Sequence, residues 1–313
     1  MEIKNKYNSN KVVVIKLGQD DIDGMLLNHD LNDEGIYSYM ENEFIESVMN
    51  YLPEYAMGQD PIPMSPVKII PYLREAAKSI IKIKKIEEIK YYLDKKIPCK
   101  DWDQEILKFY NSKGIFSELI LHFLLREFKN TVALISKIYF KDSFSHEAHG
   151  FDVVHVSNDN KLWIGETKFY NDGKRGLRAL IDDLNTHFKH DYLKEQFVII
   201  SRALVHNNIL REEWVDKLNS ATRLEEKLNM IVIPLLCIYE DTVASEIITA
   251  INEGADADAI YLKHVSELKE YFDEKNTFIN KERVQTLLIL LPVESKNKIV
   301  SGMLSKIYSL QSI

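Results

Sequence analysis

Hydrophobic residues fall into two kinds of segment along the chain, some with helical spacing and some forming short continuous runs. Residues 115–128 (IFSELILHFLLREF) are apolar nearly all round, which predicts a buried helix. Residues 131–140 (TVALISKIYF) are rich in β-branched and aromatic residues and predict a strand. In residues 176–192 apolar side chains recur every three or four positions, as in an amphipathic helix. The apolar run at 196–205 (QFVIISRALV) predicts a further strand.

A hairpin is predicted between the first strand and the amphipathic helix. The polar turn signal Ser-Asn-Asp-Asn at 157–160 separates two apolar segments within residues 150–170. The resulting order is helix, strand, strand, strand, helix, strand. Continuous apolar strands among helices are typical of a sheet that is buried on both faces. The sequence therefore predicts an α/β fold whose mixed sheet is flanked by helices.

The flanking segments also contain predicted elements. Toward the N-terminus we expect a strand at 11–17, a helix at 40–57, a proline-rich loop at 60–66 and further helices to about residue 93. Toward the C-terminus we expect a strand at 284–291 and a final helix. No linker-like composition separates these parts, so we expect one elaborated domain. Its parts are an N-terminal elaboration at 1–100, a core at 101–240 and a C-terminal extension at 241–313 packed on the core.

Composition places the chain in the ordinary globular class. Of its 313 residues, 45% are hydrophobic and 28% are charged, which argues against a disordered or fibrous protein. The polar start lacks a hydrophobic signal segment, and the longest apolar runs, such as 230–239, are shorter than the roughly 20 residues of a membrane helix. We therefore expect a cytoplasmic protein that does not enter a membrane. Cys99 and Cys237 lack the spacing of a disulfide framework or a structural zinc site.

The net charge limits how the protein could act on nucleic acid. With 40 Lys and Arg against 48 Asp and Glu, the chain carries −8 at pH 7. Sequence-independent DNA binding depends on neutralising phosphates, so this balance argues against a protein that coats nucleic acid. An enzyme needs only a basic groove, so a nuclease is not excluded. We expect such an enzyme to receive DNA from a partner that has its own affinity for it.

The predicted hairpin carries the candidate chemistry. Glu166 and Lys168 are two residues apart on one strand, so their side chains point to the same face. If the loop consists of residues 158–160, Asp152 lies directly opposite Glu166, with Cβ atoms roughly 5 Å apart. A loop one residue shorter or longer would put the two carboxylates on opposite faces. With the odd loop, two carboxylates and one ammonium group converge.

Such a group suits metal-assisted hydrolysis of phosphodiesters. Two adjacent buried carboxylates repel each other, and a divalent cation compensates for that repulsion. Oxygen ligands favour Mg²⁺ or Mn²⁺ over Zn²⁺. Lys168 could orient a water molecule or stabilise charge on a phosphate. Glu118, the first acid of the buried helix, either joins this cluster or makes a hydrogen bond or salt bridge at the helix end.

The tripeptide Glu-x-Lys is not informative by itself. It occurs seven times, beginning at Glu2, Glu88, Glu127, Glu166, Glu225, Glu267 and Glu294. Most copies lie in polar segments, where a solvated ion pair is expected. Only the copy at Glu166 lies on a predicted buried strand with an acid at the matching position of its hairpin.

With these residues in place, the chain resembles a known family. The order of elements, with Gly150-Phe-Asp152 and Gly165-Glu-Thr-Lys168, resembles the core of the PD-(D/E)xK nuclease superfamily. The segments Phe116-Ser-Glu118, His149-Gly-Phe-Asp152 and Gly165-Glu-Thr-Lys-Phe-Tyr170 are similar to HamA, the nuclease subunit family of the Hachiman anti-phage defence system. Phe151 occupies the position before the first acid, where the superfamily usually has proline.

The resemblance implies a metal-dependent DNase that works with a helicase partner, HamB. It implies a restriction-endonuclease-like nuclease core at 101–240 with Mg²⁺ or Mn²⁺ as cofactor, and it leaves 1–100 as the partner surface. Asp152 and Glu166 would bind the metal, Lys168 would assist the attacking water, and Glu118 would complete the acidic cluster. Thr167, between the two motif residues, is included among the predicted metal contacts.

Four residues near the hairpin are candidates for DNA contacts. Lys174, Arg175 and Arg178 begin the helix after the hairpin, where backbone N–H groups also favour phosphate. A solvated basic turn is the alternative for these three. His149 could contact a phosphate or a metal-bound water, or simply form a turn beside Gly150.

Two other function classes remain open. A noncatalytic subunit could keep a nuclease-like fold for partner binding, although the intact set of Asp152, Glu166 and Lys168 argues against it. A hydrolase of RNA or of a nucleotide would use the same residues, and the sequence does not separate it from a DNase.

Overall fold

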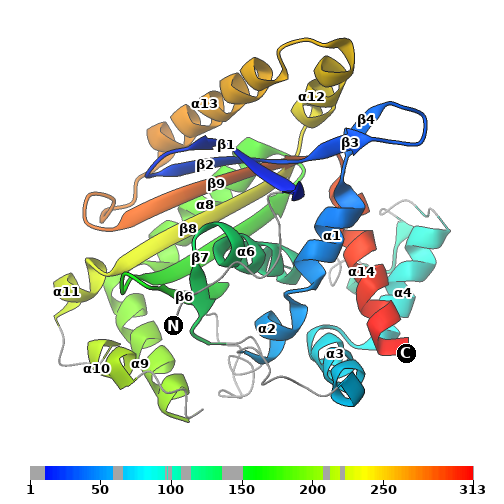
Figure 1. The fold of residues 1–313 in the computed structure, drawn as a ribbon. Coiled ribbons are helices and arrows are strands. Elements are labelled where there is room, and N and C mark those ends of the chain that lie inside the picture. Colours follow the sequence, from blue (N-terminus) through cyan, green and yellow to red (C-terminus); the bar gives the residue numbers. More distant parts are fainter. Residues whose placement is uncertain are drawn as a thin grey trace.

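The centre of the molecule is a mixed seven-stranded sheet in the order β1-β2-β9-β8-β7-β6-β5 (Figure 1). The computed structural model describes residues 11–58, 66–95, 97, 101–106, 114–135, 151–206, 212–218 and 223–312. The strands of the sheet are β1 (Val13–Gly18), β2 (Ile22–Leu27), β5 (Thr131–Ala133), β6 (Val153–Ser157), β7 (Leu162–Tyr170), β8 (Ile231–Glu240) and β9 (Gln285–Val293). The predicted α/β class with a mixed sheet is confirmed.

Parallel pairing holds the middle of the sheet together. The parallel pairs are β2 with β9, β9 with β8, and β8 with β7. The antiparallel pairs are β1 with β2, β6 with β7, and β5 with β6. Strand β8 has the sequence IVIPLLCIYE and is buried along nearly its whole length. Such continuously apolar strands form where a parallel sheet is covered on both faces.

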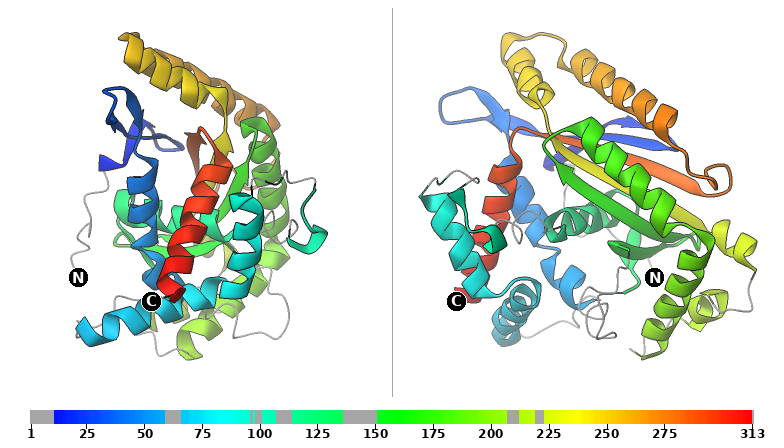
Figure 2. Two further views of the ribbon diagram at one scale, coloured as in Figure 1. Left: turned by 90° about the vertical axis from the view of Figure 1, so that its right-hand side faces the viewer. Right: turned by 180° about the vertical axis from the view of Figure 1, so that it is seen from behind.

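Helices cover the two faces of β7. Helix α6 (Ile115–Phe128) lies on one face and α8 (Gly173–His187) on the other, as the front and rear views show (Figures 1 and 2). The side chains of β7 follow this arrangement. A methyl group added at Gly165 would meet Leu121 of α6, while the next residue, Glu166, contacts His187 of α8. Alternation along β7 therefore decides which helix each side chain meets.

The segments on both sides of the core in sequence contribute to the same sheet and its helices. Strands β1 and β2 come from the N-terminal part, and β9 comes from the C-terminal part, so one sheet includes strands from all three segments of the sequence. Helix α14 (Lys296–Ser312) packs against the N-terminal helices, and its Lys298 forms an ion pair with buried Glu41. The predicted strand at 284–291 and the predicted final helix are confirmed as β9 and α14.

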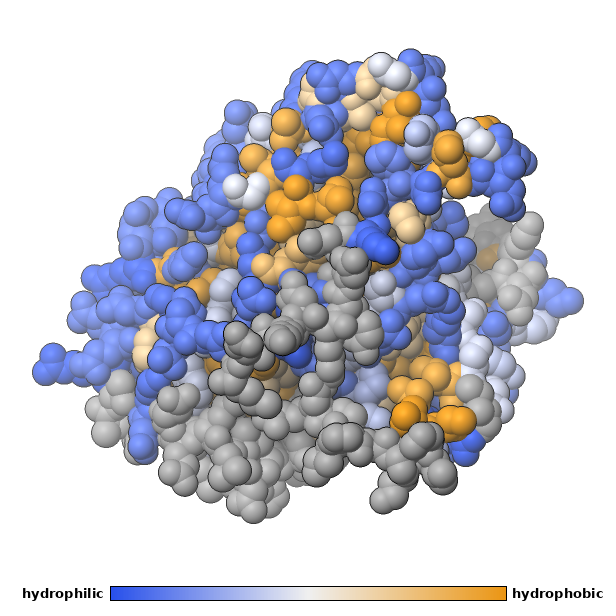
Figure 3. Space-filling model, in the orientation of Figure 1, coloured by the Kyte–Doolittle hydropathy of each residue, from blue (hydrophilic) through white to orange (hydrophobic). Residues whose placement is uncertain are grey.

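The remaining elements surround the sheet. A small sheet of β3 (His29–Leu31) and β4 (Tyr37–Tyr39) extends from β2. The other helices are α1 (Glu41–Met49), α2 (Leu52–Met57), α3 (Pro66–Ile80), α4 (Ile83–Asp94), α9 (His190–His206), α10 (Glu212–Leu218), α11 (Leu224–Leu228), α12 (Thr242–Glu253) and α13 (Ala257–Lys275). None of the helices in the described ranges is long and apolar enough to cross a membrane. Among the described residues on the face in Figure 3 most are hydrophilic, and hydrophobic ones gather in the upper middle, with a smaller group at the lower right.

One predicted strand is wrong. Residues 196–205 lie within helix α9, and the buried residues Leu193, Gln196, Phe197 and Ile200 recur at helical spacing. A short run that is apolar throughout does not distinguish a strand from a buried helix by periodicity. The strand that completes the predicted order is β8, which follows α9 and the short helices α10 and α11.

Other predicted boundaries need smaller corrections. The single helix expected at 40–57 is two helices, α1 and α2, and Pro53 lies in the first turn of the second one. Strand β5 covers only the first three residues of the strand predicted at 131–140, and residues 136–140 lie outside the described part. Most of the proline-rich loop predicted at 60–66 lies outside it as well.

Candidate functional site

The hairpin has the predicted three-residue loop, and its paired register runs from that loop to Val153 and Gly165. The Ser157 N–H donates to the Lys161 carbonyl oxygen at 3.1 Å, which closes a loop of residues 158–160. Val153 and Gly165 form the last pair of this register, and beyond it the Asp152 N–H donates to the Gly165 carbonyl oxygen at 3.1 Å instead of continuing the regular pairing toward Glu166. Asp152 itself lies one residue before β6.

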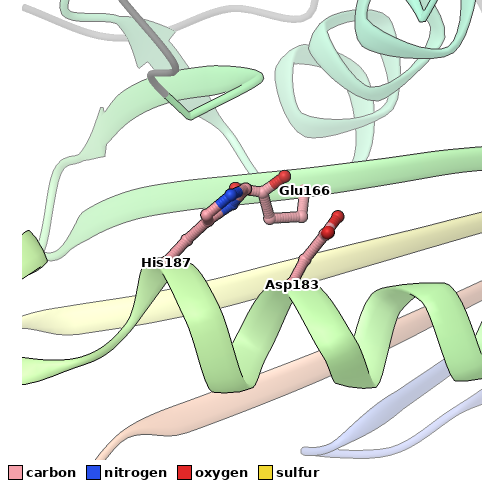
Figure 4. A group of neighbouring side chains, drawn as sticks. All are labelled: Glu166, Asp183 and His187. Carbon is pink, nitrogen blue, oxygen red and sulfur yellow. The ribbon is translucent and has the colours of Figure 1, made fainter.

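Glu166 and Lys168 share one face of β7, and that face meets α8. Nδ1 of His187 and Oε1 of Glu166 share a hydrogen bond of 2.8 Å. Lys168 forms an ion pair with Asp183. Asp183 and His187 are four residues apart and lie on the same side of α8, so the two pairs are neighbours. Figure 4 shows Glu166, Asp183 and His187 pointing toward one another.

Asp152 is linked to the opposite face of β7 through Thr167. Its Oδ2 atom accepts hydrogen bonds from the Thr167 backbone N–H at 2.8 Å and from the Thr167 hydroxyl at 2.9 Å. The Thr167 hydroxyl also lies 2.8 Å from that of Ser117 on α6. The carboxylate of Asp152 is therefore fixed where the hairpin and α6 meet.

Glu118 lies on the α6 side of this junction. It is 8% exposed, and the hydroxyl of Tyr55 on α2 donates to its Oε2 atom at 2.5 Å. Burial, then the charge of Glu118 and finally that of Asp152 raise the pKa of Tyr55 well above its ordinary value. The structure thus brings Glu118 near Asp152, whereas Glu166 faces the other helix.

Electrostatic effects connect Asp152 to the α8 side too. Burial lowers the pKa of Lys168, but the bond to Asp183 and the charges of Asp183, Asp152 and Glu166 outweigh it, so the pKa is raised. After burial, the charges of Glu166, Glu195, Asp183 and Asp152 contribute to raising the pKa of Tyr192 to about 12. Asp152, Glu166 and Lys168 therefore form one electrostatic unit, and Asp183 is a further member of it.

Burial dominates the chemistry of Glu166. Its side chain is only 3% exposed, and this burial raises its pKa although the bond and charge of His187 act in the opposite direction. The hydrogen bond to Glu166 in turn raises the pKa of His187. A buried carboxylate of this kind is stabilised by a positive partner, which is either a cationic side chain or a metal ion.

The residues on the α8 side fit a divalent cation. Within the described part of the chain, Glu166, Asp183 and His187 each offer a ligand atom, and all three atoms lie within 4.8 Å of one another. Two carboxylates and one imidazole are suitable donors for a divalent first-row ion. Asp152, Thr167 and Glu118, the other predicted metal residues, are not members of this group.

The basic residues at the start of α8 contact aromatic rings. Lys174 and Arg178 lie 5.5 and 5.6 Å from the ring centre of Tyr271 on α13, and Arg175 lies 5.5 Å from that of Tyr170. The carboxylate of Asp172 caps the helix by accepting from the Arg175 N–H. His149, the fourth residue predicted to contact DNA, lies outside the described residues.

The sequence analysis did not identify Asp183 or His187. Both lie on the predicted amphipathic helix, three residues after the buried Leu180 and Leu184. Polar residues that border an apolar stripe at a spacing of four could have been recognised as facing the sheet edge.

Comparison with known families accounts for nearly the whole chain. The HamA family model matches residues 4–307. The chain belongs to the HamA family. It is therefore a component of the Hachiman anti-phage defence system and of its complex. A search of curated proteins found no significant match.

The HamA match also covers the flanks of the sequence. It extends from before β1 into α14, so the N-terminal strands and the C-terminal helix are parts of the family's fold. Strand β7 with Glu166, Thr167 and Lys168, and helix α8 with Asp183 and His187, lie near the middle of the matched region.

Proposed function

We propose that this HamA protein is a metal-dependent DNase, the effector of the defence complex. The observation that carries the proposal is the pair Glu166 and Lys168 on one face of a buried strand, with the Asp152 carboxylate held by Thr167 between them. Three acids and one lysine in a single electrostatic unit are the parts that phosphodiester hydrolysis requires. In the described part of the chain, no other Glu-x-Lys segment lies on a strand of the sheet.

The residues present suit Mg²⁺ or Mn²⁺. Glu166 is the central ligand in this proposal, because it adjoins Thr167, which binds Asp152, and lies beside the donors of α8. When bound, the ion would polarise a phosphate oxygen and lower the pKa of a water molecule. Lys168 orients that water or stabilises the developing negative charge. Thr167 holds the carboxylate of Asp152, and Glu118 with Tyr55 adds a second acid behind it.

The order of elements supports a PD-(D/E)xK-like nuclease core within 101–240. Helix α6, strands β5, β6 and β7, helix α8 and strand β8 follow one another as that core requires, with three further helices before β8. The acids occupy corresponding places, on α6, before β6 and on β7.

DNA delivery by a partner completes the proposal. A chain with a net charge of −8 is poorly suited to hold DNA alone, so we propose that the helicase HamB brings the substrate and controls cleavage. The N-terminal part, residues 1–100, is the proposed surface for this partner. Strong DNA binding by the isolated chain at high salt would contradict delivery by a partner.

A timed digestion tests the proposal. Supercoiled, linear and single-stranded DNA, with RNA alongside, would be incubated with the protein in Mg²⁺, Mn²⁺ or EDTA, with and without the helicase. Glu166→Gln should abolish cleavage, whereas Glu267→Gln, which changes the exposed glutamate of a Glu-x-Lys segment on α13, should not change it. Cleavage that resists EDTA or Glu166→Gln would overturn the proposed chemistry. Loss of RNA instead of DNA would assign the substrate to RNA.

One observation favours a noncatalytic alternative. Lys168 already forms an ion pair with Asp183, and Glu166 already shares a hydrogen bond with His187. These contacts could serve only to join β7 to α8. In that case no condition would give cleavage, and the variants would change stability while leaving partner binding intact.

A further inference from the structure

The geometry points to a metal site completed by helix α8, with Glu166, Asp183 and His187 as ligands and with a preference for Mn²⁺ over Mg²⁺. This inference rests on the proposed metal-dependent function and extends it to residues that the motif does not include. The three ligand atoms lie within 4.8 Å of one another, which is the spacing of donors that share one ion. They come from a central strand and from the helix that covers it (Figure 4).

His187 is held in an orientation suited to binding. Its ring stacks on that of Tyr192, with centroids 5.1 Å apart and an interplanar angle of 17°. Nδ1 points at Glu166, 2.8 Å from the carboxylate oxygen. Tyr192 also contacts buried Phe151, so the stack is anchored between the hairpin and α9. A ligand whose ring is fixed by its surroundings loses little freedom when it binds an ion.

Asp183 supplies the second donor from the helix. Its side chain is 19% exposed, and its Oδ2 atom is buried and paired with Lys168. A cation that binds Asp183 competes with Lys168 for this oxygen. We infer that Lys168 then turns toward the phosphate, where its charge serves the reaction.

The imidazole determines which ion the site prefers. Mg²⁺ and Ca²⁺ take oxygen ligands almost exclusively, whereas Mn²⁺ and later first-row ions accept nitrogen as well. A site of carboxylates alone would not favour Mn²⁺ in this way. The contribution of His187 should therefore appear in the ratio of the two affinities and not only in their size.

Direct binding measurements test the inference without relying on cleavage. Mn²⁺ binding to the full-length protein would be followed by electron paramagnetic resonance of the free ion, and Mg²⁺ binding by competition. His187→Gln should weaken Mn²⁺ binding by roughly tenfold or more and Mg²⁺ binding by less. Asp183→Asn should weaken both. The matched controls are Asp182→Asn, the exposed neighbour on α8, and His190→Gln, an exposed histidine on α9.

The outcomes separate this inference from the proposed function. Metal-dependent cleavage that Glu166→Gln abolishes, together with Mn²⁺ affinity unchanged in His187→Gln, would overturn the α8 site and keep the DNase. Mn²⁺ binding that depends on His187, without cleavage of any nucleic acid, would keep the site and overturn the DNase. Thermal unfolding of each variant distinguishes loss of a ligand from loss of the fold. If His187→Gln is unstable, His187→Asn is the second variant, and Mn²⁺ affinity unchanged in a folded variant overturns the site.

Discussion

Lys168 on β7 is paired with Asp183 on α8, directly beside the hydrogen bond between Glu166 and His187. The two pairs can form side by side because their residues have similar spacing on the two elements: two residues of a strand span about 6.6 Å, and four residues of a helix span about 6 Å. A Glu-x-Lys segment on a strand can therefore be matched by an Asp-x-x-x-His segment on the helix that covers it. This relationship connects the motif to a helix that the motif does not mention.

Replacing Lys168 by methionine should slow cleavage strongly in a protein that still folds, with some loss of stability because Asp183 loses its ion-pair partner. Methionine keeps the unbranched shape but removes the charge that we assign to the water or the phosphate, a role worth roughly 100-fold or more in rate. Cleavage rates and thermal unfolding would be measured together. Lys263→Met is the control, since Lys263 is exposed on α13. Full activity of Lys168→Met would remove this residue from the mechanism.

Thr167→Val should destabilise the protein by about 1–3 kcal/mol. The hydroxyl of Thr167 donates to Asp152 and contacts Ser117, and the residue is 4% exposed, so valine leaves a carboxylate and a hydroxyl short of a partner. Urea unfolding gives the change in free energy. Thr249→Val on the exposed face of α12 is the matched control and should have little effect. Equal stability of both variants would contradict the role assigned to Thr167.

Gly165→Ala should destabilise the sheet, because the position has no room for a side chain. An added Cβ would lie 2.7 Å from side-chain atoms of both Leu121 and Val153. Overpacking of this kind costs about 1–3 kcal/mol in the free energy of unfolding. Gly18→Ala, whose added Cβ has 3.4 Å to its nearest neighbour, is the control. The result would conflict with the packing of α6 against β7 if both variants unfolded at the same urea concentration.

The hairpin could be predicted because its signals are local. The polar turn at 157–160 fixes the loop length, and the side-chain period of two then fixes which residues face each other. Glu166 and Lys168 could be placed on one face of the strand on this basis alone. The link between Asp152 and Thr167 could not, because Asp152 lies beyond the end of β6 and its carboxylate reaches across to the other face.

The parts that could not be predicted depend on contacts distant in sequence. Residues 196–205 are apolar enough for a strand, and only burial against neighbouring elements selects helix α9. In the sequence, Asp183 and His187 have the pattern of ordinary polar residues on a helix surface. Only the packing of α8 against β7 brings them next to Lys168 and Glu166. Strands β8 and β9 likewise find their places in the sheet through parallel pairing across long connections, which leaves no local signal.

Removing the basic side chains at the start of α8 should weaken DNA binding. The variant Lys174→Ala, Arg175→Ala and Arg178→Ala would be compared with the native protein in the presence of the helicase. If each residue binds one phosphate, the slope of log affinity against log salt should fall by about 0.9 for each phosphate that is no longer neutralised. Lys263→Ala serves as the control on α13. An unchanged salt slope would favour the alternative of a solvated basic turn.

A buried pair of histidines predicts how stability depends on pH. His122 on α6 is 1% exposed and lies 2.9 Å from His155 of β6, nitrogen to nitrogen. Glu54 of α2 lies 3.7 Å from the other ring nitrogen of His122, and Arg126 is nearby. Burial, followed by the charges of His155 and Arg126, lowers the pKa of His122 well below its ordinary value of 6.5. The folded protein therefore keeps this ring neutral.

The direction of this pH dependence follows from the pH at which His122 binds a proton in the folded and in the unfolded chain. Above pH 6.5 His122 is neutral in both states and contributes no pH dependence, whereas below pH 6.5 only the unfolded chain gains a proton. The free energy of unfolding should then fall by up to about 1.4 kcal/mol per pH unit from this group. Urea unfolding between pH 7.5 and 5.5 would measure the slope. His122→Gln, which can still hydrogen-bond His155, should give a shallower slope, while the exposed His190→Gln should retain the native one. Identical slopes for all three proteins would contradict the lowered pKa of His122.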